Sequence, residues 1–221
     1  MERSLLVVTG LAREARAAES LGITTLCSGG DSLRLAAMLA EIDAAAFWGV
    51  VSFGIAGGLD PELEPGDLVL GASAVYGGEC YDACNDLNQT LRRTLFARDI
   101  RVIEGPVAGV DAAVMTPEHK ASLRASSGAV AVDMESHVTA RWARDNELPF
   151  GIVRVVSDPA HRALPALAAT ALKPNGGVDV LRVMKGLARA PRQLGALASA
   201  GLDARTAFAA LGGVGKLFAA I

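Results

Sequence analysis

Short, almost entirely apolar runs are the feature that most constrains how this chain can fold. Ser4–Thr9, Phe47–Phe53 and Phe150–Ser157 have the length of β-strands, and each carries hydrophobic side chains on both of the faces that a strand presents. Strands of this kind are covered on both faces by other elements. The runs therefore predict a layered α/β domain, with helices on either side of a sheet.

Strand and helix signals alternate between these runs. Thr116 followed by Pro117 and Glu118 marks a helix start, with a Thr cap, Pro at the first helical position and an acid in the first turn. Gly77–Ile100 is polar and is predicted as loop plus helix. Further strands are predicted at Ile23–Cys27, Asp67–Ala74 and Ala129–Val132, and further helices at Leu11–Ser20, from Asp31 or Ser32 to about Ile42, and at Glu135–Asn146.

Composition excludes several classes of protein. The chain has 221 residues, and 51% of them are hydrophobic, so it has enough apolar surface for a folded core. The longest relevant charge-free stretch, Ala44–Leu59, is shorter than the roughly 18–20 apolar residues of a membrane-spanning helix and is rich in glycine. Arg13 and Glu14 interrupt the N-terminal apolar run before a signal-peptide core is complete. We therefore expect a cytoplasmic protein.

Cysteine and charge narrow the choice further. The three cysteines, Cys27, Cys80 and Cys84, lack the spacing of a zinc site, and their odd number argues against a disulfide framework. The net charge of −3 gives no reason to expect a nucleic-acid partner. The charge is unevenly distributed, because residues 171–221 carry +5 and residues 1–170 carry −8. We expect one domain over residues 1–221, in which residues 171–221 form a basic, Ala/Leu-rich helical tail.

Two segments that follow predicted strands carry small and acidic residues. Gly10 follows the first strand and permits close approach of a ligand to the backbone, and Glu14 lies in the first turn of the next helix. Glu14 can alternatively serve only to complement the helix dipole. In Ser52–Leu59 a strand is predicted to end in a run of small residues, whose backbone N–H groups can line a binding site. Ligands of layered α/β domains bind at such strand ends.

Two later segments place carboxylates at strand ends. Asp133 and Glu135 flank Met134 where a strand gives way to a helix, and a carboxylate there can accept hydrogen bonds from a vicinal diol. The alternative is that both acids only cap this helix and complement its dipole. Ser157 and Asp158 end the last apolar strand, where apolar walls would raise the pKa of a carboxyl group and suit it to general acid catalysis. An Asx turn before Pro159 is the alternative.

Taken together, these segments resemble the family of nucleoside phosphorylases and nucleosidases that act on purine nucleosides. The resemblance covers Leu5 to Ala160, and in detail the chain is most similar to the hopanoid-associated branch, whose members are taken to remove adenine from adenosylhopane. The basic tail is also similar to that branch. The motifs that carry the resemblance are V-T-G-L-A-R-E-A-R, S-G-G-D, S-F-G-I-A-G-G-L-D-P, A-V-D-M-E-S-H and R-V-V-S-D-P-A followed by A-L-P.

The resemblance implies a three-layer α/β/α sandwich around a mixed sheet, in a homo-oligomer, and assigns roles to individual residues. It implies that Asp158, supported by Ser157, protonates or hydrogen-bonds N7 of the purine, and that Glu14 orients an attacking water. It implies no cofactor and no metal ion, with phosphate as co-substrate only in a phosphorolysis. The expected ribose contacts are Met134, Glu135, Gly54, Ala56 and Gly57, and the expected base contacts are Ser157, Asp158, Ala113 and Asp133.

The chain departs from the family pattern at two places. Ala113 stands where nucleosidases usually carry an aromatic residue that stacks on the base. Val51, Ser52 and Phe53 stand where many phosphorylases place an arginine that binds phosphate, and Arg13 or Arg16 could substitute for it. The departures favour hydrolysis over phosphorolysis by a small margin.

Three readings of function follow. The first is release of adenine from adenosylhopane, and the others are cleavage of a soluble nucleoside resembling methylthioadenosine or futalosine, and non-catalytic nucleoside binding. The helix predicted at Val178–Ala188 carries Arg182, Lys185 and Arg189 on one side, with Arg192 after it. Such a stripe over 178–192 can attract anionic lipid headgroups, so we expect peripheral contact with the inner membrane, or else an ordinary solvated helix face.

Overall fold

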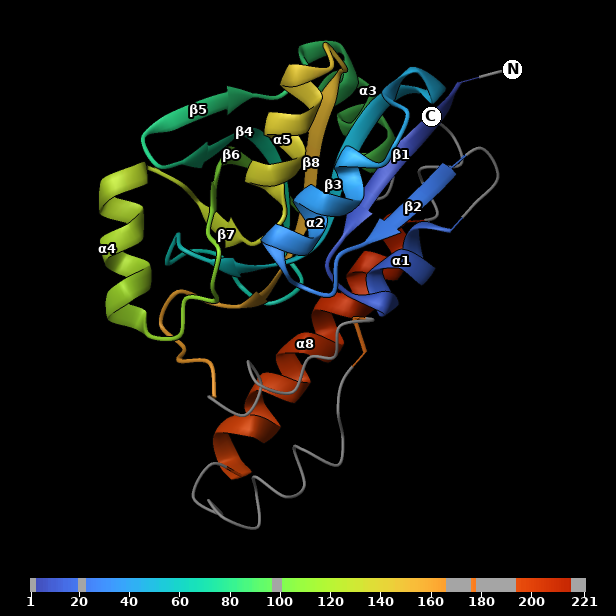
Figure 1. The fold of residues 1–221 in the computed structure, drawn as a ribbon. Coiled ribbons are helices and arrows are strands. Elements are labelled where there is room, and N and C mark those ends of the chain that lie inside the picture. The colour runs from blue at the N-terminus through green and yellow to red at the C-terminus, as the bar shows by residue number, and fades with distance from the viewer. Residues whose placement is uncertain (1–2, 20–22, 97–100, 166–175, 178–193, 216–221) are drawn as a thin grey trace.

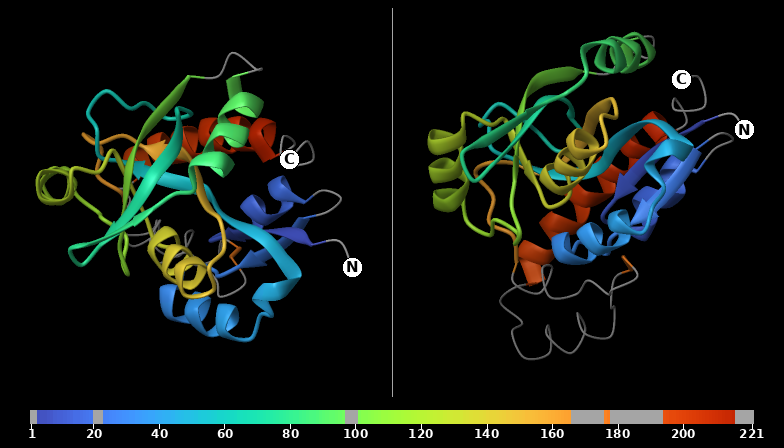
Figure 2. Two further views of the ribbon diagram at one scale, coloured as in Figure 1. Left: turned by 90° about the horizontal axis from the view of Figure 1, so that it is seen from above. Right: turned by 45° about the horizontal axis from the view of Figure 1, so that its top comes forward.

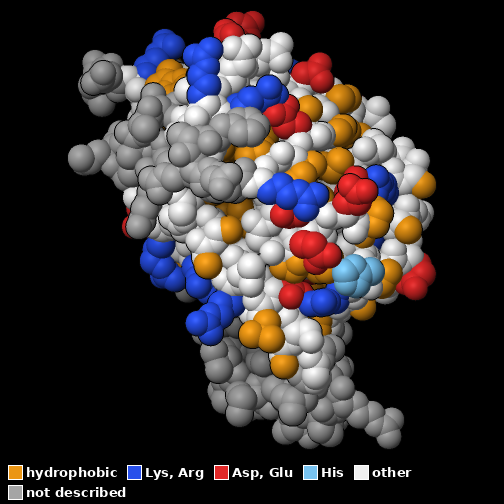
Figure 3. All heavy atoms as spheres, turned by 180° about the vertical axis from the view of Figure 1, so that it is seen from behind, with side chains coloured by type: hydrophobic (Ala, Val, Ile, Leu, Met, Phe, Trp, Pro, Cys, Tyr) orange, Lys and Arg blue, Asp and Glu red, His pale blue; other side chains and the backbone are white. Residues whose placement is uncertain are grey.

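The computed structural model describes residues 3–19, 23–96, 101–165, 176–177 and 194–215. The helix expected at Val178–Ala188 and its basic stripe lie outside the described residues. Among the residues that are described, no helix is both long enough and apolar enough to cross a membrane. Side chains of both charge signs are interspersed on the face shown in Figure 3.

A mixed eight-stranded sheet forms the centre of the fold (Figure 1), as predicted. Strand β3 pairs in parallel with β1 and β8, whereas β4 runs antiparallel to β8. The pairings of β3 with β7, β7 with β6, β6 with β4, β4 with β8 and β8 with β3 close a ring, and β1 and β2 extend the sheet beyond it. The strands are β1 (Ser4–Thr9), β2 (Ile23–Cys27), β3 (Phe47–Gly58), β4 (Leu68–Tyr76), β5 (Glu79–Asp82), β6 (Val102–Gly109), β7 (Ala131–Asp133) and β8 (Phe150–Asp158).

Helices begin where the sequence places capping residues. The Asp31 carboxylate accepts a hydrogen bond from the backbone N–H of Arg34 (2.9 Å), and the Thr116 hydroxyl accepts one from that of His119 (3.3 Å). Gly128 ends its helix with φ at +68°, a left-handed conformation that favours glycine. The helices are α1 (Ala12–Ala18), α2 (Ser32–Ala40), α3 (Asn85–Phe96), α4 (Pro117–Ser127), α5 (Ser136–Asp145) and α8 (Leu194–Gly215), with a 3-10 turn at Ala44–Ala46.

Two hydrophobic cores, one on each face of the sheet, explain the uninterrupted apolar strands. In β1, Leu6 and Val8 point into a core shared with α2 and α5, whereas Leu5 and Val7 point into a core shared with α3 and α8. The left view of Figure 2 shows these two pairs of helices on opposite sides of the sheet. The layered α/β domain predicted from the apolar runs, and the three layers that the resemblance implies, are therefore confirmed.

Helix α8, from the predicted tail, belongs to this second core. Its residues Ala207, Leu211 and Val214 are buried against strand residues such as Phe53 and Val155. The helix packs on β8 and α1, and it runs along one side of the molecule in Figure 1. At its C-terminal end it approaches α1 so closely that a Cβ at Gly215 would overlap the carbonyl oxygen of Ala17.

Some predicted boundaries were wrong. Strand β3 does not end at Phe53 but continues through Gly58, because β8 pairs with it as far as Gly57 and β7 pairs with Gly57 and Gly58. Strand β6 was not predicted, since Gly105 and Pro106 interrupt its apolar pattern. A register shift in β4 accommodates Pro106, and Val130 packs where a side chain at Gly105 would stand. Gly77–Ile100 contains α3, as expected, but also the unpredicted strand β5, which pairs antiparallel with β4.

Candidate active site

A cavity of about 310 Å³ lies where β1, β3, β7 and β8 end and where α8 passes over them. Its volume is at the lower end of the range for small-molecule sites. Nine of the ten predicted site residues line it, and Gly54 does not. The nine are Glu14, Ala56, Gly57, Ala113, Asp133, Met134, Glu135, Ser157 and Asp158.

Asp158 ends β8 with its carboxylate held by two side chains. Oδ2 accepts a hydrogen bond from the Lys120 ammonium (2.6 Å), and Oδ1 lies 2.7 Å from the Ser157 hydroxyl. The same hydroxyl lies 3.2 Å from the carbonyl oxygen of Ala56, so its single proton can serve either acceptor. Burial raises the pKa of Asp158 although Lys120 opposes the rise. These contacts show a buried carboxyl group rather than only the Asx turn considered as an alternative.

Glu14 is held by three backbone N–H groups. Its Oε2 accepts hydrogen bonds from Gly10 (2.8 Å) and Leu11 (2.7 Å), and its Oε1 accepts one from Ile55 (2.8 Å). Each carboxylate oxygen has two acceptor positions, so Oε1 keeps one free for a further donor. Burial raises the pKa of Glu14, opposed by Arg154 and by the three N–H donors. The contact with Ile55 of β3 goes beyond the helix-dipole alternative.

Arg154 is a residue of the site to which the sequence assigned no role. It lies in the middle of β8 with its side chain fully buried. Nε is 2.6 Å from Asp133 Oδ2, and Nη1 is 3.4 Å from Glu135 Oε2. The guanidinium also donates hydrogen bonds to Ser52 Oγ (2.5 Å) and to the carbonyl of Ile55 (3.3 Å). Burial alone would lower the pKa of Arg154, but the surrounding carboxylates raise it above its ordinary value.

Asp133 and Glu135 have different environments in this cluster. Asp133 Oδ1 accepts the backbone N–H of Ser136 (3.0 Å), so it caps α5 as the alternative interpretation expected, while Oδ2 faces Arg154. Glu135 Oε1 accepts a hydrogen bond of 3.4 Å from the Ser28 hydroxyl. Burial raises the pKa of Glu135 to about 7 despite Arg154, and the nearby carboxylates add to the rise. The predicted contact of Asp133 with a base stays a prediction.

Two glycines are needed for the carboxylates to fit. A Cβ at Gly54 would lie 2.7 Å from both Glu14 Cδ and Arg154 Nη1, so Gly54 makes room for these side chains and stands behind the cavity wall. A Cβ at Gly10 would lie 2.5 Å from Glu135 Oε1. Gly10, the glycine of the G-x-x-x-E motif, therefore leaves room for the Glu135 carboxyl group as well as lining the cavity.

The remaining wall of the cavity is apolar. Leu164 and the α8 residues Ala200, Ala204 and Phe208 line it, together with Val110, Ala113 and Val114 from the segment between β6 and α4. Asp111 fixes this segment by hydrogen bonds with Ser32 (2.8 Å) and Tyr76 (2.7 Å), neither of which the sequence singled out for this role. Phe208 is the one aromatic residue among the described lining residues.

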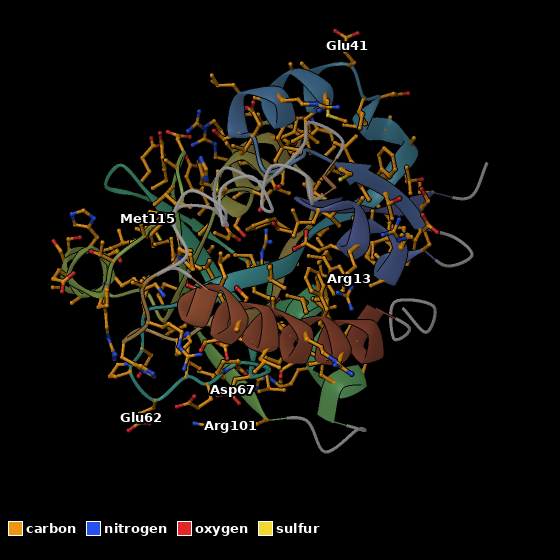
Figure 4. All side chains as sticks on the ribbon, turned by 90° about the horizontal axis from the view of Figure 1, so that it is seen from below. Arg13, Glu41, Glu62, Asp67, Arg101 and Met115 are labelled. Atoms are coloured by element: carbon orange, nitrogen blue, oxygen red, sulfur yellow. The ribbon has the colours of Figure 1, made fainter. Side chains whose placement is uncertain are left out.

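Arg13, which the sequence offered as a phosphate ligand, packs against the outer part of the cavity wall without lining the cavity itself. Its guanidinium carbon lies 4.3 Å from the centre of the Phe208 ring, and Figure 4 shows Arg13 beside α8. Neither Arg13 nor Arg16 lines the cavity. Among the residues that the structure describes, no group of three or more His, Cys, Asp or Glu side chains is arranged to hold a metal ion.

Comparison with known proteins agrees with the fold. Residues 22–189 match the family model of the phosphorylase superfamily, so the chain belongs to that superfamily. A 5′-methylthioadenosine/S-adenosylhomocysteine nucleosidase from Neisseria meningitidis, solved with methylthio-immucillin-A, superposes with a TM-score of 0.72 at 20% identity, covering 100% of both chains. Futalosine hydrolase of Helicobacter pylori gives a TM-score of 0.66 at 19% identity, covering 72% of this chain and 86% of that one.

A further similar structure is a putative methylthioadenosine nucleosidase from Weissella paramesenteroides. It has a TM-score of 0.67 at 18% identity and covers 99% of this chain and 98% of its own. At these identities, the three structures establish that the fold is shared. What this chain's own site does must be argued from its residues.

The pKa of Glu135 predicts how stability varies with pH. Because the pKa in the folded protein (about 7) exceeds the ordinary value of 4.5, Glu135 takes up a proton on folding, and stability falls as pH rises through this window. Glu135→Gln cannot titrate. The free energy of unfolding of the wild type relative to Glu135→Gln should fall between pH 5 and pH 8, by at most about 3 kcal/mol. Urea unfolding at pH 5, 6, 7 and 8 measures this.

The matched control is Glu41→Gln, at the exposed C-terminal end of α2 and outside the cavity (Figure 4). A difference between the wild type and Glu135→Gln that stays constant over this range would contradict the assignment.

Proposed function

We propose that this protein hydrolyses the N-glycosidic bond of purine nucleosides. The observation that carries the proposal is a pair of buried carboxyl groups of raised pKa, Asp158 and Glu14, that line one cavity from different elements. Carboxyl groups of raised pKa in a cavity are well suited to proton transfer near neutral pH. The superfamily and the nucleosidases that share the fold support the same reaction class.

Asp158 serves as the general acid. An adenine anion is a poor leaving group, and protonation at N7 allows the base to leave as a neutral molecule. Burial favours the protonated form of Asp158. When Asp158 donates its proton to the base, the Ser157 hydroxyl can turn its own proton from the carbonyl of Ala56 to Oδ1 and stabilise the resulting carboxylate.

Glu14 orients and deprotonates the attacking water. Its Oε1 has one acceptor position left after the bond from Ile55, which suits a water proton. The cluster of Glu14, Asp133 and Glu135 holds three carboxyl groups against the single cation of Arg154. A phosphate dianion would be repelled by those carboxyl groups of the cluster that are ionised, whereas a neutral water is not. Hydrolysis is therefore favoured over phosphorolysis.

Glu135 and Met134 hold the ribose. The ribosyl centre gains positive charge as the base leaves, as in glycoside hydrolysis. A carboxylate beside the sugar stabilises that charge in a site that excludes water, and Glu135 can also accept hydrogen bonds from the two ribose hydroxyls. Ala56 and Gly57 of β3 complete this part of the wall.

The reaction is tested by measuring adenine release from adenosine derivatives with and without phosphate. We expect the corresponding free sugar, with a hydroxyl group at C1, as the product in both cases, and rates reduced about 10²–10⁴-fold in Asp158→Asn and Glu14→Gln because each removes a proton-transfer group. Asp145→Asn and Glu19→Gln, at exposed positions, are the matched controls and should match the wild type.

A ribose 1-phosphate product that requires phosphate would show phosphorolysis instead. Unchanged adenine release in Asp158→Asn would exclude it as the acid. Tight nucleoside binding without any cleavage would identify a nucleoside-binding module.

We further propose that the preferred nucleoside carries a large apolar 5′ substituent, as adenosylhopane does. The apolar wall formed by Leu164 and by Ala200, Ala204 and Phe208 of α8 supports this proposal. A cavity of about 310 Å³ accommodates a nucleoside, so a hopane body would extend beyond it. Soluble substrates resembling methylthioadenosine or futalosine are the alternative, and the shared fold supports them equally.

A series of adenosines with 5′-alkyl groups of increasing length separates these substrates. If the apolar wall binds the substituent, kcat/KM should rise about fourfold for each added methylene, since burial of one is worth about 0.8 kcal/mol. Ala204→Trp should lower kcat/KM for long chains more than for adenosine. Ala198→Trp, at an exposed position of the same helix, is its control. A series that falls with length would favour a small soluble nucleoside.

The basic segment 178–192 is proposed to bring the enzyme to the lipid surface. The proposal depends on the charges of Arg182, Lys185 and Arg189 in the sequence. In co-sedimentation with anionic vesicles at low salt, the wild type should pellet, and a variant with these three residues changed to Gln should stay in the supernatant. The control variant carries the same change at Arg92, Arg93 and Arg101. Equal recovery of wild type with and without anionic lipid would exclude the contact.

A further inference from the structure

Lys120 is a charged side chain with no exposure to solvent. It lies on α4, outside the set of residues that the sequence singled out, and 0% of it is accessible. Its ammonium donates to Asp158 Oδ2 (2.6 Å) and to the backbone carbonyl oxygens of Asp158 (3.3 Å), Pro159 (2.8 Å) and Arg162 (3.2 Å). A lysine is almost never fully buried unless it is paired, and this one is paired with the carboxylate of the proposed acid.

The carbonyl contacts join α4 to the turn that follows β8. The carbonyl groups of Asp158, Pro159 and Arg162 in this turn all accept hydrogen bonds from the one Lys120 ammonium group. On the outer side of the turn, the Arg162 guanidinium forms an ion pair with Asp203 of α8. Further along, the N–H of Leu164, a cavity residue, bonds to the carbonyl of Met115 (2.9 Å). The turn is therefore fixed from α4 and from α8, and Lys120 is its internal anchor.

We propose that Lys120 positions Asp158 for catalysis: its ammonium occupies Oδ2, so that Oδ1 is the oxygen that exchanges a proton with the purine. The inference rests on the proposed function. The Ser157 hydroxyl lies against Oδ1, where it can accept a hydrogen bond from the protonated acid or donate one to the carboxylate. A free carboxyl group could rotate and offer either oxygen, whereas this one is held in a single orientation.

The ammonium also sets the proton affinity of the acid. Among the residues that the structure describes, the charged groups that face Asp158 are Lys120 from α4 and Asp203 from α8, and Asp203 is itself paired with Arg162. Burial and Asp203 raise the pKa of Asp158, whereas Lys120 and the hydrogen bond from the Ser157 hydroxyl lower it. Without Lys120, the Ser157 hydroxyl would still oppose the rise, but the positive charge next to Asp158 would be lost. An acid of excessive pKa would be protonated but slow to release its proton.

The test compares the pH dependence of Lys120 variants. Lys120→Met removes the charge, and Lys120→Gln removes it while keeping a hydrogen-bond donor, which guards against a Met variant that fails to fold. Both should move the alkaline limb of kcat/KM upward by roughly 1–3 pH units, because an opposite charge at this distance lowers a carboxyl pKa by that amount. Arg124→Met is the control, since it removes a cation of α4 that is paired with Asp60 at the surface.

A residue with only a structural role would lower kcat at every pH and leave the alkaline limb of kcat/KM at the same pH, and this result would overturn the inference.

A second measurement does not depend on turnover. The ¹³C resonance of the Asp158 carboxyl, assigned by its absence in Asp158→Asn, should titrate at higher pH in the Lys120 variants than in the wild type. An unchanged titration would also overturn the inference. If the wild type cleaves no purine nucleoside, the proposed function fails, and the ¹³C titration still decides whether Lys120 controls Asp158.

Discussion

The buried guanidinium of Arg154 is the interaction on which the rest of the site depends. A charge in the centre of a sheet is tolerated only if it is paired, and Arg154 is paired with carboxylates from β7 and the start of α5, while its remaining donors reach β3. Removing one partner of such a group typically costs about 3–5 kcal/mol. Arg154 thus ties together the strand ends that carry the site.

Charge divides the cavity into two parts. Around Arg154, three carboxyl groups face one guanidinium, and the raised pKa values of Glu14 and Glu135 reflect that excess together with burial. Around Asp158, one carboxyl group faces one ammonium, so this part has no excess of carboxyl groups over cations. In the proposed reaction, the first part would stabilise the positive charge that develops on the sugar. The second part would supply the acid that protonates the leaving base.

The sequence predicted the framework of the site better than its internal contacts. Apolar runs revealed β1 and β8, and small or acidic residues at their ends identified Glu14 and Asp158, because strand ends meet at one edge of a sheet. The sequence does contain a signal for Arg154, because it is a charged residue inside an otherwise apolar strand. Such a side chain must be buried and paired. Lys120 carried none, since α4 is largely polar and a lysine there looks like a surface residue.

Because Ala113 is not aromatic, it cannot stack on a base, and this affects which part of the proposed substrate supplies binding energy. Stacking of a base on an aromatic ring is worth about 1–3 kcal/mol, and the segment on which the resemblance places the base lines this cavity with Val110, Ala113 and Val114. In the proposed reaction, binding energy that this segment does not supply has to come from a contact to another part of the nucleoside. The apolar wall of α8 can supply it only if the substrate has an apolar group to bury there. Binding energy from such a remote group can hold the reacting bond against Asp158 and Glu14, so a truncated nucleoside should lose turnover as well as affinity.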